Sequence, residues 1–280
     1  MYYDLNVPLP SAAELPRTLS FLSTLGYTTL ALSTSLSGKL PNQLPVPPPL
    51  PSHPGLSLLT RLTLTLSDPS ANHRLSNFTS TYQILALRPT TEKLFLAACS
   101  TLECDLISLD FSQRLPFALK HKTVGAALLR GISFEVCYSA GVADVQARRN
   151  LISGVQMLLR ATRGGRGIVI SSEAKNVLGV RGPEDVINLA VLWGMGQEQA
   201  RDAICGRMRV VVRQAESRRR GYKGVVEVVE DGERKRKAGE QGGGGKKQKD
   251  GQGGQGGEGK KMTKAEKRAA AQKVKVEVKA

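Results

Sequence analysis

Short apolar runs alternate with helix-like segments along residues 1–215. Seven runs have the length and composition of buried strands: Tyr2–Asn6, Tyr27–Ser33, Leu56–Ser67, Tyr82–Leu87, Asp105–Phe111, Ile132–Tyr138 and Gly167–Ser171. Between them lie segments with helical periodicity: Glu14–Leu25, Thr91–Leu102, Lys120–Arg130 and Val142–Thr162. A further helix is expected to begin at Pro183 and to end at Gly194, because proline suits a first helical turn and glycine a helix end.

This alternation predicts an α/β fold with parallel strands and right-handed crossovers. Periodicity alone fits both an open doubly wound sheet and a closed barrel. The early strands are not followed by a glycine-rich phosphate turn, which favours the barrel. We therefore expect a TIM-like βα barrel of about seven parallel strands.

Two changes in composition divide the chain. Seven of the 15 residues from 40 to 54 are proline, which predicts an extended surface loop inserted between two strands. Residues 216–280 carry 19 Lys and Arg against 10 Asp and Glu, together with glycine-rich runs. Such a segment has too few apolar side chains to form a core. We expect one domain over residues 1–215 and a disordered basic tail over 216–280 that serves targeting, nonspecific RNA contact or solubility.

The overall charge points to a polyanionic partner. The net charge is +16 and the pI is about 9.9, which favours nucleic acid or an acidic membrane surface as partner. No apolar run approaches the roughly 18 residues of a membrane-spanning helix, so we expect no membrane insertion. The four cysteines show no CxxC pair, which suits a reducing compartment, either cytosol or nucleus.

Catalytic patterns are scarce. The three histidines, His53, His73 and His121, form no HxH or HExxH pair. Carboxylates at strand ends have two interpretations, a magnesium site or ordinary capping and ion pairing: Asp4, Asp68, Asp110, Glu135 and Glu173. Cys137 has no histidine nearby in sequence to activate it, and a buried structural cysteine is expected. We therefore predict no catalytic residue, no metal and no cofactor.

Basic side chains, in contrast, follow several predicted strands. This set comprises Arg88, Arg114, Lys175 and Arg181, with His121 and Lys122 at a helix start. In a βα barrel, residues beyond the strands converge on one face, where these bases would match phosphate oxygens. The alternative is that they are ordinary solvated charges. A second basic set, facing RNA, an acidic protein or solvent, lies along and after one helix: Arg148, Arg149, Arg160, Arg163 and Arg166.

Several segments, taken in order, resemble one known family. They are Tyr3-Asp4-Leu5-Asn6-Val7-Pro8, Leu25-Gly26-Tyr27, Asp105–Arg114, Phe134–Ser139, Ile170-Ser171-Ser172 and Arg181–Leu189. Together they make residues 1–215 similar to the roughly thirty-kilodalton protein subunit of eukaryotic and archaeal ribonuclease P. The resemblance implies a TIM-like barrel in a nuclear, partly nucleolar ribonucleoprotein that removes 5′ leaders from precursor tRNA. It also implies sharing with RNase MRP, which processes ribosomal RNA, and pairing with a small RRM-like subunit.

The resemblance also bears on individual residues. In that family RNA is the catalyst, so the resemblance implies that this protein binds RNA without a catalytic role. Arg114, His121, Arg130 and Arg181 fall in family-like segments and are expected to contact RNA or hold the contacting loops, with Asp185 orienting an arginine. The barrel also resembles metal-dependent PHP phosphoesterases, which supply the alternative function. On their HxH motif, however, Asn6 and Pro8 replace the two histidines. A third alternative is a general basic chaperone or chromatin protein acting through the tail.

Overall fold

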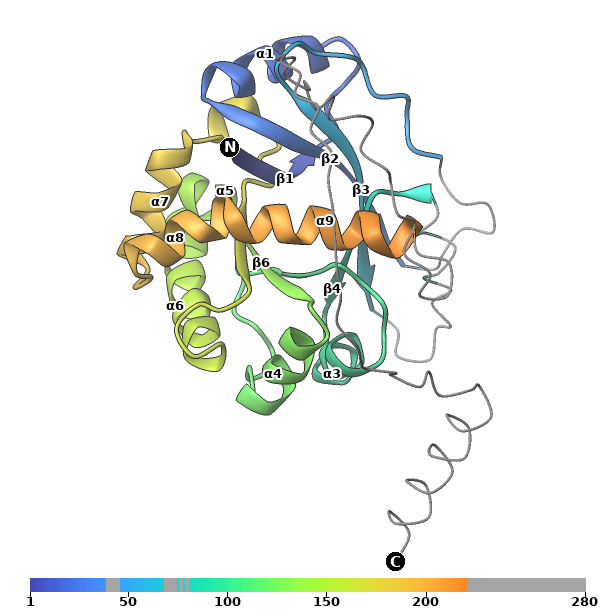
Figure 1. Ribbon diagram of the computed structural model, residues 1–280. Coiled ribbons are helices and arrows are strands. Elements are labelled where there is room, and N and C mark those ends of the chain that lie inside the picture. The colour runs from blue at the N-terminus through green and yellow to red at the C-terminus, as the bar shows by residue number, and fades with distance from the viewer. Residues whose placement is uncertain (39–45, 68–74, 76–77, 79–80, 221–280) are drawn as a thin grey trace, which may run out of the picture. The chain divides into compact units, whose positions relative to one another are not determined.

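A computed structural model describes residues 1–38, 46–67, 75, 78 and 81–220 of the chain. It contains seven parallel strands that neighbour one another in chain order. They are β1 (Tyr2–Pro8), β2 (Tyr27–Ser37), β3 (Ser57–Leu66), β4 (Ile84–Pro89), β5 (Leu106–Leu109), β6 (Ser133–Cys137) and β7 (Ile168–Ser171). All seven predicted strands are present, and the expected α/β barrel is confirmed (Figure 1).

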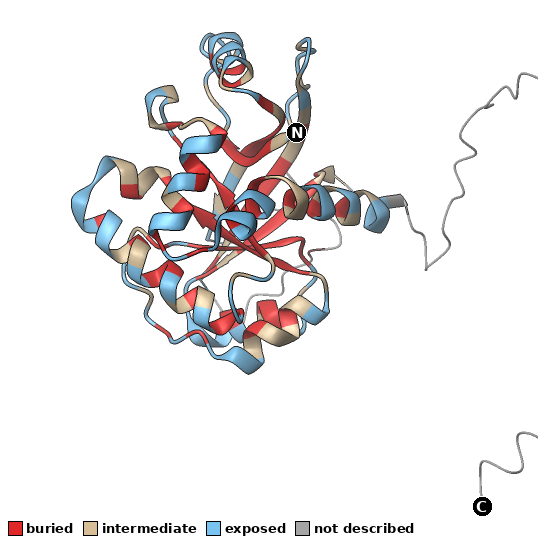
Figure 2. Cartoon of the chain, turned by 60° about the vertical axis from the view of Figure 1, so that its left-hand side comes forward, coloured by how far each residue is buried: buried red, intermediate tan, exposed pale blue. Residues whose placement is uncertain are grey.

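Helices cover the outside of this sheet. They are α1 (Leu15–Thr24), α3 (Glu92–Ser100), α4 (His121–Leu129), α5 (Ser139–Ala143), α6 (Val145–Ala161), a short 3-10 helix η1 (Val177–Gly179), α7 (Pro183–Leu192), α8 (Gln197–Ile204) and α9 (Gly206–Arg220). Figure 2 shows the strands buried and the outward helix faces exposed, as the apolar periodicity predicts. Among the described helices, none is long and apolar enough to cross a membrane.

Polar contacts between β7 and β1 close the sheet into a nearly complete barrel. The Glu173 N–H donates to the Asn6 carbonyl oxygen at 2.8 Å. One position earlier, the Ser172 N–H donates to Oδ1 of Asp4 at 3.1 Å. The carboxylate of a buried aspartate therefore takes the place of one backbone acceptor at this seam. Burial raises the pKa of Asp4, while the bonds from Ser172 and Asn6 act in the opposite direction.

The last helix, α9, lies across the amino end of the barrel (Figure 1). Its buried residues Met208 and Val211 pack with Tyr3, Leu5 and Val169 from the strands. This closes the core at the end opposite to the βα loops. The predicted domain boundary at 215/216 falls inside α9, whose Arg218 still forms an ion pair with Asp105. The sequence reading missed α9 because arginines interrupt its apolar face.

The predicted helix Val142–Thr162 is wrong in one respect, since the structure divides it into α5 and α6. Asp144 adopts an extended conformation between them, and its side chain accepts a bond from the Ala147 N–H at 2.7 Å. An aspartate at this position is a strong helix N-cap, which explains the break.

The two segments with unusual composition are described only in part. Residues 46–54 of the predicted proline-rich loop contain neither helix nor strand and lie between β2 and β3. The rest of that loop, residues 40–45, and the predicted tail from residue 221 onward lie outside the described residues.

Candidate nucleic-acid interface

A buried ion pair spans the interior of the barrel. Arg61 on β3 donates to both carboxylate oxygens of Glu135 on β6, at 2.5 and 2.6 Å, and both side chains are fully buried. The guanidinium also donates to the Leu5 carbonyl oxygen at 2.6 Å and to Thr63 Oγ1 at 3.0 Å. Burial is the largest influence and would raise the pKa of Glu135, but the Arg61 charge and the hydrogen bonds from Arg61, Ser171 and Ser108 together lower the pKa below its usual value.

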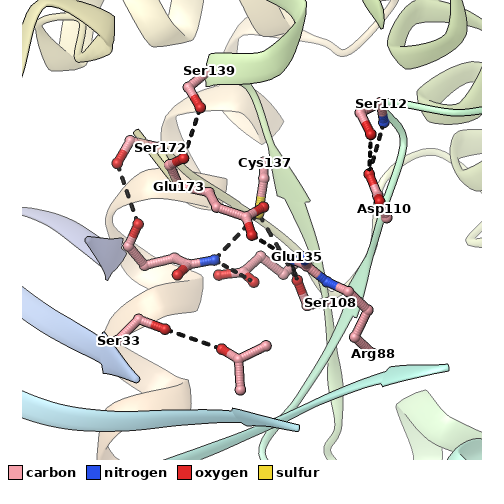
Figure 3. A network of polar contacts seen from close by, with 12 residues as sticks. Ser33, Arg88, Ser108, Asp110, Ser112, Glu135, Cys137, Ser139, Ser172 and Glu173 are labelled. Carbon is pink, nitrogen blue, oxygen red and sulfur yellow. Dashed lines mark hydrogen bonds and ion pairs between the residues drawn. The ribbon is translucent and has the colours of Figure 1, made fainter. Parts of the chain in front are cut away.

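A second layer of polar side chains lies next to this pair, toward the carboxyl ends of the strands (Figure 3). Asn6 Nδ2 donates to Glu135 Oε2 and to Cys137 Sγ, both at 3.4 Å. Burial raises the pKa of the Cys137 thiol well above its usual value. Cys137 is therefore a protonated, buried packing residue, as the sequence indicated.

At the barrel mouth, Arg88 forms an ion pair with Glu173 at 2.7 Å and donates to Ser108 Oγ at 3.1 Å (Figure 3). Its side chain is only 18% exposed, so this arginine belongs mainly to the barrel wall. A hollow of about 710 Å³ opens above it, and its lining includes Asp110, Lys175 and Arg181. The structure thus brings together three of the basic residues that were predicted to bind RNA: Arg88, Lys175 and Arg181.

The two basic residues that follow β7 differ in whether their side chains are bonded to the protein. Lys175 is exposed and makes no side-chain bond to any described residue. The Arg181 guanidinium instead donates to the carbonyl oxygens of Leu178 at 2.9 Å and Val180 at 3.1 Å. The hydroxyl of Tyr138 accepts from the Arg181 N–H at 3.0 Å, so the backbone of this loop is also held. Lys175 is available to an anion, whereas Arg181 mainly shapes its loop.

A neighbouring group follows β5. Arg114 lies in the loop before α4 and lines a hollow of about 500 Å³ that also includes Phe117 and Asn150. His121 and Lys122 form the first turn of α4 and are exposed. In contrast to Lys120, which pairs with Glu92 at 2.7 Å, these three side chains have no bonded partner among the described residues. They lie at the same end of the barrel as Lys175, because βα loops all begin at the carboxyl ends of strands.

Two predicted positions do not fit this surface. Arg130 follows α4 and lies at the opposite, amino end of the barrel, where it donates to the carbonyl oxygens of Ala98, Cys99 and Leu102 at 2.6–3.3 Å. It therefore satisfies the last carbonyls of α3. Asp185 is exposed in the first turn of α7 but forms no ion pair with an arginine within the described ranges. The helix dipole favours a carboxylate in the first turn of α7, and this position of Asp185 needs no arginine partner.

The strand-end carboxylates are engaged by the protein itself. Asp4 accepts backbone N–H groups and Asp110 accepts both the N–H and the hydroxyl of Ser112, while Glu135 and Glu173 pair with arginines. Asp68 lies outside the described residues. In the part of the chain that the structure describes, no group of three or more His, Cys, Asp or Glu side chains is placed to hold a metal ion. The capping and pairing interpretation of these carboxylates is the one that the geometry supports.

Sequence reasoning missed the central ion pair and the arginines of α9. The one signal for Arg61 was its place as a single charge in a strand of leucines and threonines. For Arg209 and Arg213 the signal was their spacing of four residues in a segment rich in arginine, beside the apolar Val210–Val212.

Comparison with known proteins places these features in a family. The model of the family "RNase P subunit p30" matches residues 1–220. The probable ribonuclease P protein subunit 3 of Schizosaccharomyces pombe is 42% identical over 232 residues, which cover 81% of this chain and 98% of that protein. The ribonuclease P/MRP protein subunit RPP1 of Saccharomyces cerevisiae is 36% identical and covers 64% of this chain and 71% of its own length. A chain in a structure of archaeal ribonuclease P with mature tRNA shares the fold, with a TM-score of 0.62 at 13% identity, over 82% of this chain and 99% of that one.

Proposed function

The chain belongs to the RNase P subunit p30 family, and we propose that it works as a non-catalytic, RNA-binding subunit of a ribonuclease P ribonucleoprotein. In this role it supports the removal of 5′ leaders from precursor tRNA, while the RNA component performs the cleavage. The protein contributes by holding RNA in position.

One observation carries the proposal. At the carboxyl end of the barrel the acidic side chains Glu135 and Glu173 are neutralised by arginines, whereas exposed bases at the same end have no described partner. These free bases are Arg114, His121, Lys122 and Lys175. Asp110 and Asp185 are also exposed at this end and form no ion pair with a described residue, so it is the free basic side chains, and not an absence of acids, that attract phosphate oxygens here. Only 5% of the residues are aromatic, which favours recognition of the RNA backbone over base stacking.

The remaining predicted bases have supporting roles. Arg88 stabilises the barrel mouth through Glu173, and Arg181 holds the loop that presents Lys175. Arg181→Ala is therefore expected to weaken RNA assembly by loosening this loop while the barrel stays folded. Arg130 is distant from this surface and acts on α3 alone.

The finer assignments follow from the family. We propose that the protein also serves RNase MRP in ribosomal RNA processing, since the budding yeast relative is named as a subunit of both complexes. We further propose that it pairs with a small RRM-like protein subunit, and that it acts in the nucleus, including the nucleolus. The basic segment from residue 221 to 280 would supply nuclear targeting.

The alternative of a metal-dependent phosphoesterase is not favoured. Its first strand would need metal-binding histidines, and Asn6 here donates its amide to Glu135 and Cys137 instead. The Arg61 guanidinium, paired with Glu135, occupies the interior beside it. A fixed positive charge next to the expected ligand positions disfavours a bound cation.

Depletion and rescue in the native cell test the proposal. Loss of the protein should cause precursor tRNAs with unprocessed 5′ leaders to accumulate, and wild-type protein should restore processing. Arg114→Gln/Lys175→Gln should restore it less well. The control Arg160→Gln/Arg163→Gln removes two exposed charges without a described side-chain partner from the last turn of α6 and just after it, at the opposite end of the barrel, and should rescue fully. Normal 5′ processing after depletion would refute the function, and equal rescue by both variants would refute the proposed RNA surface.

A further inference from the structure

The arginines of α9 divide into two groups. On one side of the helix, Arg207 donates to Ser133 Oγ at 3.0 Å and Arg218 pairs with Asp105 at 2.8 Å. Both partners lie just before or at the start of a strand in the β5–β6 half of the barrel. These two arginines anchor α9 across the amino end, and their charges are largely satisfied by the protein.

The other side of α9 carries arginines without such partners. Arg209 and Arg213 are exposed, and their side chains form no hydrogen bond or ion pair with any described residue. They border a hollow of about 400 Å³ at the amino ends of β1, β2 and β3, whose lining also includes the buried Thr29 and the exposed Ser57. Figure 1 shows α9 passing in front of these strand ends. Glu216 is the acidic member of the lining, so the hollow carries two positive charges against one negative charge.

We propose that this hollow, with Arg209 and Arg213, is a second RNA-binding surface at the amino end of the barrel, where it holds the phosphate backbone. Residues four apart on a helix have Cβ atoms about 5–6 Å apart, so the two guanidiniums can each reach one of two nearby phosphates. The planar guanidinium fork matches phosphate oxygens in a bidentate manner. The hollow between them gives the sugar–phosphate chain room to approach the hydroxyl group of Ser57.

The chemistry of this surface favours RNA over an acidic protein. Protein interfaces depend on apolar and aromatic anchors at their centre. Here the strand residues that line the floor, Tyr3 and Leu59, are each only 7% exposed and offer little apolar area. The exposed residues of the lining are Arg209, Arg213, Ser57 and Met1, so charged and hydroxyl groups outnumber the one exposed apolar side chain, as phosphate contacts require.

The inference rests on the proposed function and extends it. The bases that follow β5 and β7 lie at the carboxyl end of the barrel, whereas Arg209 and Arg213 lie at the amino end. A protein with phosphate-binding surfaces at both ends of one rigid barrel holds two separate RNA segments at a fixed distance.

Salt-dependent binding to a fluorescein-labelled RNA duplex of 20 base pairs and arbitrary sequence tests this surface. The full-length chain is compared with Arg209→Gln/Arg213→Gln and with the control Arg160→Gln/Arg163→Gln, whose residues do not line the hollow, after circular dichroism has shown equal folding. Each lost phosphate contact should reduce the slope of log K against log salt by about 1, so the double variant should lose about 2. The deficit in affinity relative to wild type should then change by about 16-fold between 50 and 200 mM salt.

The outcomes separate cleanly. A reduced slope in Arg209→Gln/Arg213→Gln alone supports the surface. Equal reductions in the variant and the control would show a nonspecific effect of net charge and overturn it. An unchanged slope would also overturn it. Because these comparisons need only duplex RNA, they can fail while leader processing still depends on the protein, and the proposed function would then stand.

Discussion

The ion pair between Arg61 and Glu135 makes a quantitative prediction about stability. Glu135→Gln keeps the size of the side chain but leaves the fully buried Arg61 charge without a counterion. Removing one partner of a buried pair typically costs about 3–5 kcal/mol. Arg61 retains its bonds to the Leu5 carbonyl oxygen and to Thr63 Oγ1, which soften the loss and place the expected value near 3 kcal/mol.

The double variant Arg61→Met/Glu135→Leu should cost less than the two single changes together. It removes both charges and keeps similar volumes, so neither buried charge remains unpaired. Arg61→Met and Glu135→Leu alone each leave one. We expect the loss in the double variant to be smaller than the sum of the single losses by about 2 kcal/mol or more.

Equilibrium unfolding in urea at pH 7.5, followed by circular dichroism, measures the free energy of unfolding of these four variants and of the wild type. The m-value should not change, because the surface exposed on unfolding is similar. The exposed pair Lys120–Glu92, at the similar distance of 2.7 Å, provides a matched control, and Lys120→Met/Glu92→Leu with its single variants should couple by less than about 1 kcal/mol. Additive losses at the Arg61 and Glu135 positions, or coupling no stronger than in the control, would show that the buried pair does not stabilise the barrel in this way.

Three further predictions concern single side chains. Burial raises the pKa of Asp4, so ionising it costs stability as the pH rises above the unfolded value of 3.8; Asp4→Asn should therefore gain on wild type from pH 4 to pH 7 in urea unfolding, and a constant difference would contradict this. In Gly154→Ala the new Cβ would lie 2.1 Å from Phe111 Cδ1, so the free energy of unfolding should fall by about 1–3 kcal/mol despite the better helix propensity of alanine. The control Ser153→Ala should lose no stability in the same urea unfolding experiment. Arg130→Met should cost about 1 kcal/mol of stability by freeing the α3 carbonyls and leave RNA affinity unchanged in the duplex assay; weaker RNA binding would return Arg130 to the RNA-binding surface.

The strands and most helices could be predicted from sequence because their apolar periodicity is regular. All seven strands lie within about two residues of their predicted ends, apart from the extension of β2 to Ser37. The start and end of α7 were also predicted correctly, since Pro183 begins the helix and Gly194 adopts a φ of 103° just after it. The break at Asp144 was missed because the apolar face continues across it, although aspartate is a favoured N-cap.

The candidate site was less predictable, because it depends on contacts between distant residues. Arg61 and Glu135 lie 74 residues apart, and only the barrel places β3 opposite β6. Sequence position indicated correctly that Lys175 and Arg114 follow strands, and topology then put them at one end. It could not indicate that the Arg181 side chain turns back onto its own loop, or that Arg130 caps α3. These outcomes depend on local carbonyl groups that no spacing pattern reveals.

This barrel belongs to a family of ribonuclease P subunits, and we propose that it holds RNA there. The most direct test of this proposal is to tag the protein in its native cell, purify it at moderate salt, sequence the RNA that co-purifies and assay the eluate for cleavage of precursor tRNA. One or two defined structured RNAs should be enriched in the eluate, which should also cleave precursor tRNA accurately at the 5′ end. A broad mixture of RNAs, or none, with no such cleavage would contradict the proposal.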